Sequence, residues 1–300
     1  MGPVGQVRPA GTITPRRLTA RLPMFQSTIT EPKKELGGSY MLPSLFIAHG
    51  APLIAIENNE YTQFLNQLAR TMPVPKAVVL FTAHWESTVQ RVSEIDKYDT
   101  IYDFGGFDPK LYEIKYPAKG NNEISEEIKG IFNQNGIPFE VETKRGLDHG
   151  AWAVLRLLYP NADVPVIQMS VNPNLSPKEE YKIGKSLKAL REKDILIIGS
   201  GGTVHNLRAL KMQDDNRKVD SWALEFDDWV AYHIKSWDVD SLFKYESLAP
   251  NANFAVPPYG NEHFVPLFYA MGAADDTRKA TLLHRSYRYG NLSHSVWQFE

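Results

Sequence analysis

Four short runs of mostly apolar, often β-branched residues alternate along this chain with longer stretches that have the spacing of amphipathic helices. Such runs are typical of strands buried on both faces, which occur where helices cover both sides of a sheet. The four expected strands are Ser44–His49, Ala77–His84, Val164–Val171 and Asp194–Gly199. The alternation predicts an α/β fold with a central, mostly parallel or mixed sheet flanked by helices on both faces.

Helix start and stop signals support this prediction. Ser176, followed by Pro177 and Glu179, combines an N-cap residue, a first-turn proline and the acid of a capping box. Gly136 follows another expected helix as a stop signal. The expected helices are Glu60–Thr71, Asn122–Asn135, His149–Tyr159, Ser176–Lys193, Val219–Trp237 and His263–Met271. The sequence contains neither an internal repeat nor a linker-like interior segment, so we expect one domain over residues 41–300.

Residues 1–40 differ in composition from the rest of the chain. They are rich in Pro, Gly, Thr and Arg, with no acidic residue before Glu31 and no apolar core of a secretory signal. An arginine-rich, acid-poor start also resembles an organellar transit peptide. We expect a disordered N-terminal extension, with the folded domain beginning near Met41.

Composition excludes several kinds of site and partner. The 300 residues contain no cysteine, which rules out disulfides, thiolate metal sites and a cysteine nucleophile. Any transition metal must therefore be held by His, Asp or Glu. The net charge of −2 gives no basic excess for nucleic acid, and no apolar run approaches the roughly 20 residues that span a bilayer. We expect a cytoplasmic protein, monomeric or homodimeric, that binds neither nucleic acid nor a membrane.

Five of the eight histidines fall at the boundaries of expected elements. His49 and His84 end the first two strands, and His205 follows the fourth strand through a glycine-rich loop. Ligands of open α/β sheets bind beyond the carboxyl ends of the strands, so these side chains are expected at one crevice. His149 and His263 each begin an expected helix, where the helix dipole favours the neutral imidazole that binds metals.

A single histidine at a strand end is more often a hydrogen-bonded structural residue than a ligand. Five at element boundaries together indicate a metal site or an acid/base site. His233, His284 and His294 do not share that placement, and we expect them to be structural or solvent-facing.

Two loops carry weaker signals. Gly199–Thr203 has the glycines of a phosphate cradle but lacks the lysine of a P-loop, and the alternative is a tight turn that lets the backbone approach a ligand. Ser200 is not in a nucleophile elbow, which argues against a serine hydrolase. The loop Tyr102–Phe107 places glycines among aromatic residues. It either forms part of the wall of a site for an aromatic substrate or packs on the surface.

Six short motifs occur in order along the chain. They are His49-Gly50-Ala51-Pro52, Ala83-His84-Trp85, Tyr102–Phe107, Asp148-His149-Gly150-Ala151-Trp152, Val204-His205-Asn206-Leu207 and Glu262-His263-Phe264-Val265-Pro266-Leu267. Together they resemble the motifs of the class III, or LigB-type, extradiol ring-cleavage dioxygenases, and in particular the 4,5-DOPA dioxygenase-like branch. The resemblance runs from the first expected strand to the C-terminus.

This resemblance implies a non-haem Fe(II) centre, with Zn(II) as the alternative metal. The ligands that it implies are His49, His84 and His263. It also implies that His205 is the active-site base and that His149 is a second acid/base or substrate-contacting residue. The substrates would be O2 and a small, DOPA-like catechol, and the product a ring-opened semialdehyde.

One departure leaves the ligand set open. Well-studied class III enzymes use two histidines and a glutamate, the facial triad of non-haem iron. Here the third position reads as His263 with Glu262 beside it, and spacing alone does not choose between them.

Four aromatic residues near these motifs are candidates for a wall that binds the catechol ring, although core packing would explain each of them equally well. They are Trp85, Phe104, Phe107 and Tyr259. Two other functions remain open on the sequence. A three-histidine site with one open position is typical of catalytic zinc, which would suit a hydrolase. A non-enzymatic relative would use the same fold to bind protein, but it would not need five histidines together.

Overall fold

The computed structural model describes residues 41–212, 218–258 and 260–300, and the expected N-terminal extension lies outside these ranges. The described strands form one mixed sheet in the order β4-β3-β5-β2-β6-β1-β8-β7. Strands β5, β2, β6 and β1 run parallel at its centre, and β3 and β8 flank them in antiparallel orientation. The bounds are β1 Ser44–Ala48, β2 Ala77–Glu86, β3 Gln90–Ser93, β4 Phe139–Glu142, β5 Val166–Val171, β6 Ile195–Gly201, β7 Ala280–Arg288 and β8 Leu292–Phe299.

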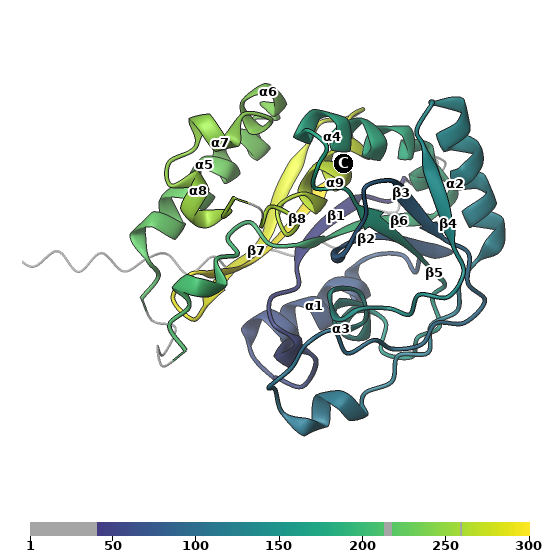
Figure 1. The fold of residues 1–300 in the computed structure, drawn as a ribbon, viewed down its shortest axis with the longest axis horizontal. Coiled ribbons are helices and arrows are strands. Elements are labelled where there is room, and N and C mark those ends of the chain that lie inside the picture. Colours follow the sequence, from purple (N-terminus) through teal and green to yellow (C-terminus); the bar gives the residue numbers. More distant parts are fainter. Residues whose placement is uncertain (1–40, 213–217, 259) are drawn as a thin grey trace, which may run out of the picture.

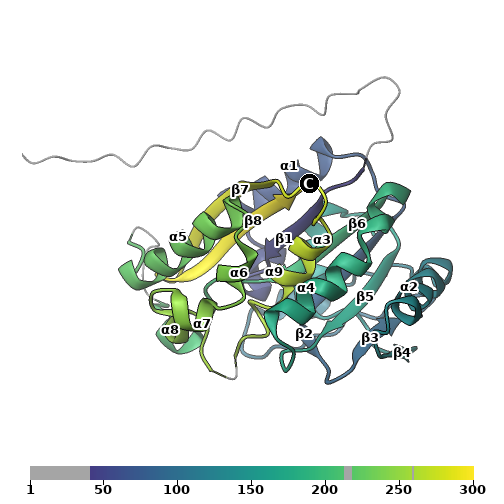
Figure 2. The same cartoon turned by 90° about the horizontal axis from the view of Figure 1, so that it is seen from above.

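Helices cover both faces of this sheet (Figures 1 and 2). Helices α1 and α3 pack on one face, and α2, α4, α5 and α9 pack on the other. Their bounds are α1 Glu60–Thr71, α2 Asn122–Gln134, α3 His149–Leu158, α4 Pro177–Ser186, α5 Ser221–Lys235, α6 Val239–Leu242, α7 Tyr245–Leu248, α8 Ala252–Ala255 and α9 Pro266–Gly272. The predicted fold class is therefore confirmed. None of the helices in the described ranges is both long enough and apolar enough to cross a bilayer.

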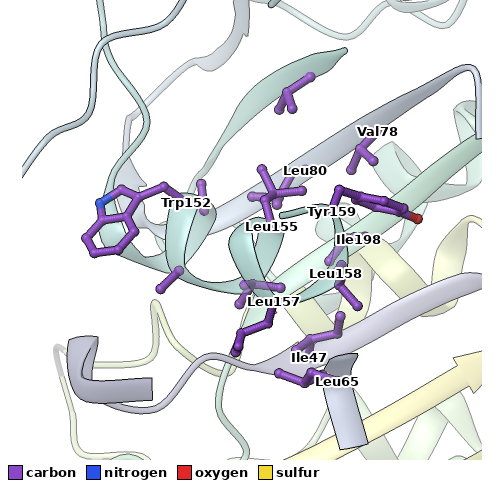
Figure 3. Close-up of a cluster of buried hydrophobic side chains, with 14 of the residues drawn as sticks. Ile47, Leu65, Val78, Leu80, Trp152, Leu155, Leu157, Leu158, Tyr159 and Ile198 are labelled. Atoms are coloured by element: carbon purple, nitrogen blue, oxygen red, sulfur yellow. The ribbon is translucent and has the colours of Figure 1, made fainter. Parts of the chain in front are cut away.

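The central strands are apolar on both sides because both sides are covered. Successive residues of a strand point to opposite faces. In β2, Val78 and Leu80 contact the core formed with α1 and α3, whereas Val79 and Phe81 contact the core formed with α2, α4 and α9. Figure 3 shows the first of these cores, in which Leu155 and its neighbours on α3 lie against the sheet. This packing fixes the position of the start of α3 relative to the strands.

Several element boundaries differ from the predicted ones by one or two residues, and three differences lie near the histidines or change an element. β2 continues through Glu86, two residues beyond His84. The capping box of Ser176 and Glu179 does begin α4, but that helix ends at Ser186 and a 3₁₀ turn, Lys188–Lys193, follows. Helix α9 begins at Pro266, so His263 lies in the turn before the helix and does not open it. Proline fits the first helical position because its missing N–H has no partner there.

Candidate metal centre

Five histidine rings meet beyond the carboxyl ends of β1, β2 and β6. Ring centroids are 4.8 Å apart for His49 and His84, 5.1 Å for His49 and His263, and 4.9 Å for His84 and His263. One nitrogen from each of these three residues lies within 4.8 Å of the other two. His149 and His205 flank the trio, with centroids 4.0 Å from His84 and 3.4 Å from His263 respectively. The structure thus brings all five sequence-predicted histidines together.

His49 is oriented by a serine on the neighbouring strand. Its Nδ1 lies 3.0 Å from the hydroxyl of Ser200, and that hydroxyl donates to the carbonyl of Gly150 at 2.6 Å. Because the serine proton is used on the carbonyl, the serine oxygen accepts from His49 Nδ1–H. A neutral imidazole carries only one proton, so His49 Nε2 is left with a lone pair.

Carboxylates orient the other two rings of the trio in the same way. Asp103 Oδ2 lies 3.2 Å from His84 Nδ1, at ion-pair distance, and Glu262 accepts from His263 Nδ1 at 2.8 Å. An ionised carboxylate only accepts hydrogen bonds, so His263 Nδ1 carries the proton, and the charge of Asp103 favours a proton on Nδ1 of His84 as well. Each Nε2 then has a lone pair. Second-sphere acceptors of this kind are usual behind metal-bound histidines.

The three Nε2 atoms fit a divalent metal ion. His263 Nε2 is buried without a hydrogen-bond partner, and His49 Nε2 lies 3.0 Å from His84 Nε2. Two facing lone pairs repel each other, and a buried unpaired nitrogen is costly. A cation bound at about 2.1 Å from each nitrogen would satisfy all three of them. In this geometry the third nitrogen beside those of His49 and His84 comes from His263. The Glu262 carboxylate is hydrogen-bonded to the other nitrogen of the His263 ring.

Burial keeps four of these histidines neutral. It lowers the pKa of His49 and His263 well below the ordinary value, and neighbouring histidines lower both further. The same two causes lower the pKa of His84 to about 4 and that of His205 to about 3. Neutral imidazole is the metal-binding form. For His263 the expected cause, a helix N-terminus, is wrong, because this residue precedes α9 and burial accounts for the shift.

Asp103 is a site residue that the sequence analysis did not single out. Its carboxylate accepts from the backbone N–H of His149 at 2.9 Å and from His149 Nδ1 at 3.0 Å, while its other oxygen faces His84. Burial alone would raise the pKa of Asp103, but these hydrogen bonds and the two histidines outweigh it and lower the pKa to about 2. Asp103 lies 46 residues before His149, so only folding reveals the contact.

Asp148 joins the start of α3 to the strands beside it. This fully buried side chain caps α3 through the N–H of Ala151 and accepts hydrogen bonds from Thr82 at 2.7 Å and from Gln168 at 2.6 Å. Arg145 donates both to Asp148, at 3.2 Å, and to the carbonyl of His84, at 2.9 Å. The network therefore holds the backbone of His84 in place relative to His149.

The glycine-rich segment Gly199–Thr203, which spans the end of β6, packs against the chain's own backbone. A Cβ added at Gly201 would lie 2.1 Å from the carbonyl oxygen of His263, and Gly202 N–H donates to that same oxygen at 2.7 Å. The structure shows a close approach of this segment to the turn that carries His263. Glycine at position 201 is required by that contact.

A cavity of about 880 Å³ opens over the histidines, and Phe104 and Phe107 form part of its wall. The ring of Phe104 meets that of His149 edge-on at 5.6 Å. Trp85 does not line this cavity, since its ring lies beneath the guanidinium of Arg145, 5.3 Å away. Tyr259 lies outside the described residues.

The remaining three histidines have local partners. His233 pairs with Asp238 at 2.9 Å. His294 is buried and stacks on Tyr61 at 4.4 Å, and His284 contacts the same ring at 5.1 Å.

Comparison with known proteins decides the family. Residues 44–299 match the family model described as the catalytic LigB subunit of aromatic ring-opening dioxygenase. The chain belongs to the LigB family. As a LigB-family member it is an oxidoreductase of the dioxygenase class, and the histidine cluster is its candidate metal centre.

Relatives of this LigB-family chain extend over nearly its whole described length. A 4,5-DOPA dioxygenase extradiol from Beta vulgaris is 39% identical over 85% of this chain and 96% of its own. One from Escherichia coli (strain K12) is 32% identical over 85% of this chain and 93% of its own. The crystal structure of an uncharacterized protein from Escherichia coli K12 matches with a TM-score of 0.73 and 29% identity, covering 86% of this chain and 100% of that one.

Proposed function

We propose that this LigB-family chain is an extradiol dioxygenase that opens the ring of a small, DOPA-like catechol with O2. The observation that carries the proposal is the set of three imidazole nitrogens, each left with a lone pair by its neighbours, at the base of an aromatic-walled cavity. The relatives from Beta vulgaris and Escherichia coli, both named 4,5-DOPA dioxygenase extradiol, support it. We also propose that residues 41–300 form the catalytic domain.

His49, His84 and His263 would hold the metal through Nε2. We propose Fe(II) for activity, with Zn(II) as an alternative occupant of the same nitrogen set. When bound, the metal supplies Lewis acidity toward the catechol oxygens and one common site for both reactants.

His205 would accept a catechol proton. It lines the cavity beside the trio, and burial lowers its pKa to about 3, so it is unprotonated before substrate binds. A catecholate developing next to it favours the protonated imidazole, because opposite charges at short range favour the charged form. His205 is then a base that becomes effective only when substrate is present.

His149 differs from His205 in having a carboxylate behind it. With Nδ1–H donated to Asp103, a proton added at Nε2 gives an imidazolium that the carboxylate stabilises. Such pairs of like residues in unlike environments are a common source of separate acid and base roles. We assign proton removal to His205 and proton return to His149, with Phe104 and Phe107 contacting the substrate ring.

Oxygen uptake tests this function. Iron-loaded protein mixed with DOPA or 4-methylcatechol in air should consume O2 and form a yellow ring-opened product. His205→Ala should lower kcat at least ~100-fold while metal content stays unchanged, since positioned acid/base groups contribute about 10²–10⁴-fold. His49→Ala should lose metal, and His233→Ala, which changes a histidine outside the cluster, should leave both activity and metal content unchanged.

Two results would contradict the proposal. One is failure to turn over any of a panel of catechols after anaerobic iron loading of folded protein. The other is a hydrolytic activity that needs zinc but neither iron nor O2.

A further inference from the structure

Arg208 is the only lysine or arginine among the described residues that line the cavity. It follows His205 by three residues, on the 3₁₀ turn Leu207–Ala209, and its side chain is exposed at the rim. Within the described ranges no carboxylate forms an ion pair with it. The guanidinium therefore presents a fixed positive charge and a fork of donors to whatever enters.

The backbone beneath Arg208 is held in place. Asn206 accepts from the Arg208 N–H at 3.1 Å and donates to the carbonyl of Phe254 at 2.8 Å. The N–H of His205 donates to the carbonyl of Ala255 at 3.1 Å. These contacts tie the loop to α8, so Arg208 keeps a defined position relative to the histidine cluster.

The negative charges of the cavity lie beside the histidines. Asp103 and Glu262 are the lining carboxylates, and each is hydrogen-bonded to a histidine of the cluster. A ligand carboxylate would be repelled at the histidine end and attracted at the rim. Charge alone thus orients an anionic ligand with its acid group toward Arg208.

The cavity is also larger than the reacting ring. Its volume of about 880 Å³ is near the top of the ~300–1,000 Å³ range of small-molecule sites, and a bare catechol fills only part of it. Leu210, Phe254 and Pro257 line it as well, and none of the three is fully buried. This space suits a short aliphatic chain that ends near Arg208.

We propose that Arg208 binds a carboxylate on the side chain of the substrate, so that the site selects catechols with an anionic tail over neutral or cationic ones. The inference rests on the proposed function for its substrate ring, but the recognition is a binding event that does not require turnover. Arg208 is here a specificity-determining residue, and the ring chemistry does not depend on it.

Three catechols with matched skeletons test this: 3-(3,4-dihydroxyphenyl)propanoate, its amide, and 3,4-dihydroxyphenethylamine. Wild-type protein should bind the acid about five- to fifty-fold more tightly than the amide, as expected for one charge-assisted bidentate contact at a partly exposed site. Arg208→Gln should bring the acid and the amide to within about two-fold of each other, and Arg208→Lys should retain part of the preference. Arg70→Gln, at an exposed arginine on α1, is the matched control and should keep the wild-type preference.

Binding is measured first without O2, by calorimetry on metal-loaded protein, and turnover is measured separately in air. In turnover, Arg208→Gln should raise KM for the acid and leave kcat nearly unchanged, since a remote contact contributes equally to ground and transition states. Equal binding of acid and amide by wild type, or a preference that survives Arg208→Gln, overturns the assignment. An acid preference that Arg208→Gln removes supports it even if no catechol is oxidised, which would count only against the dioxygenase activity.

Discussion

Four of the five clustered histidines differ from one another mainly in the group behind the ring. His49 has a serine, His84 and His149 share one carboxylate, and His263 has the glutamate beside it in sequence. Position at strand ends was enough to predict that these side chains gather, because parallel strands end at one edge. The partners were not predictable, since Ser200 lies 151 residues from His49 and Asp103 lies 46 residues from His149.

Asp103→Asn tests the shared carboxylate. An amide presents an NH₂ group toward one of the two ring N–H groups, so it cannot accept from both. We expect metal affinity and kcat each to fall about 10- to 100-fold, the usual effect of losing a second-sphere acceptor. We also expect a changed pH–rate profile, because the His149 imidazolium loses its counter-charge. Asp108→Asn, which removes an exposed carboxylate from the same region, should change neither, and an Asp103→Asn enzyme with wild-type kcat and pH profile would contradict the positioning role.

At the scale of elements, the central strands and long helices were predictable because their signals are local. Helix α1 has the predicted bounds, Glu60–Thr71, with an asparagine cap. Strands β3 and β4, on one side of the sheet, were missed because each has only four residues with mixed polarity. Strands β7 and β8, on the other side, were also not among the predicted strands. The turn of His263 was also misplaced, since its position depends on Pro266 and on contact with β6, which is distant in sequence.

Gly201→Ala tests that contact. Its Cβ would lie 2.1 Å from the carbonyl oxygen of His263, so the turn must move and take the ring with it. We expect a loss of roughly 1–3 kcal/mol in the free energy of unfolding, as for other overpacked sites, together with reduced metal content. Gly130→Ala is the matched control, because nothing lies within 4 Å of an added Cβ there and alanine favours the α2 helix. Unchanged stability and metal content in Gly201→Ala would show that the turn does not need this close approach.

At the scale of the whole molecule, the fold buries an unusual set of neutral histidines. Burial lowers the pKa of six of them, in the metal centre and in the β7–β8 layer beside α1. They are His49, His84, His205, His263, His284 and His294. The native state therefore binds fewer protons than the unfolded chain below the ordinary histidine pKa.

The sign of the resulting pH dependence follows from linkage. Above about pH 6.5 these histidines are neutral in both the native and the unfolded state. Below that pH the unfolded state binds protons that the native state, with its lowered histidine pKa values, does not bind. The metal-free protein should thus keep its stability from pH 8 to 7 and lose several kcal/mol, on the order of 1 per histidine, between pH 6.5 and 5.5. Urea unfolding at fixed ionic strength measures this, and a flat profile over that interval would contradict it. Saturating metal should raise the free energy of unfolding by a similar amount across this interval, because the native histidines that would bind it are already neutral there.

The first and last described strands are neighbours in the sheet, with Ser44 beside Phe299. The two ends of the folded chain therefore lie together, away from the metal centre. The five histidines of that centre come from the end of β1, from β2 and α3, and from the loops after β6 and before α9. A circular permutant that joins Glu300 to Met41 through a short peptide, with new ends in an exposed loop, would keep every strand pairing. With the new ends between His49 and His263, His263 would precede His49 in the permuted sequence. The same five rings would still meet.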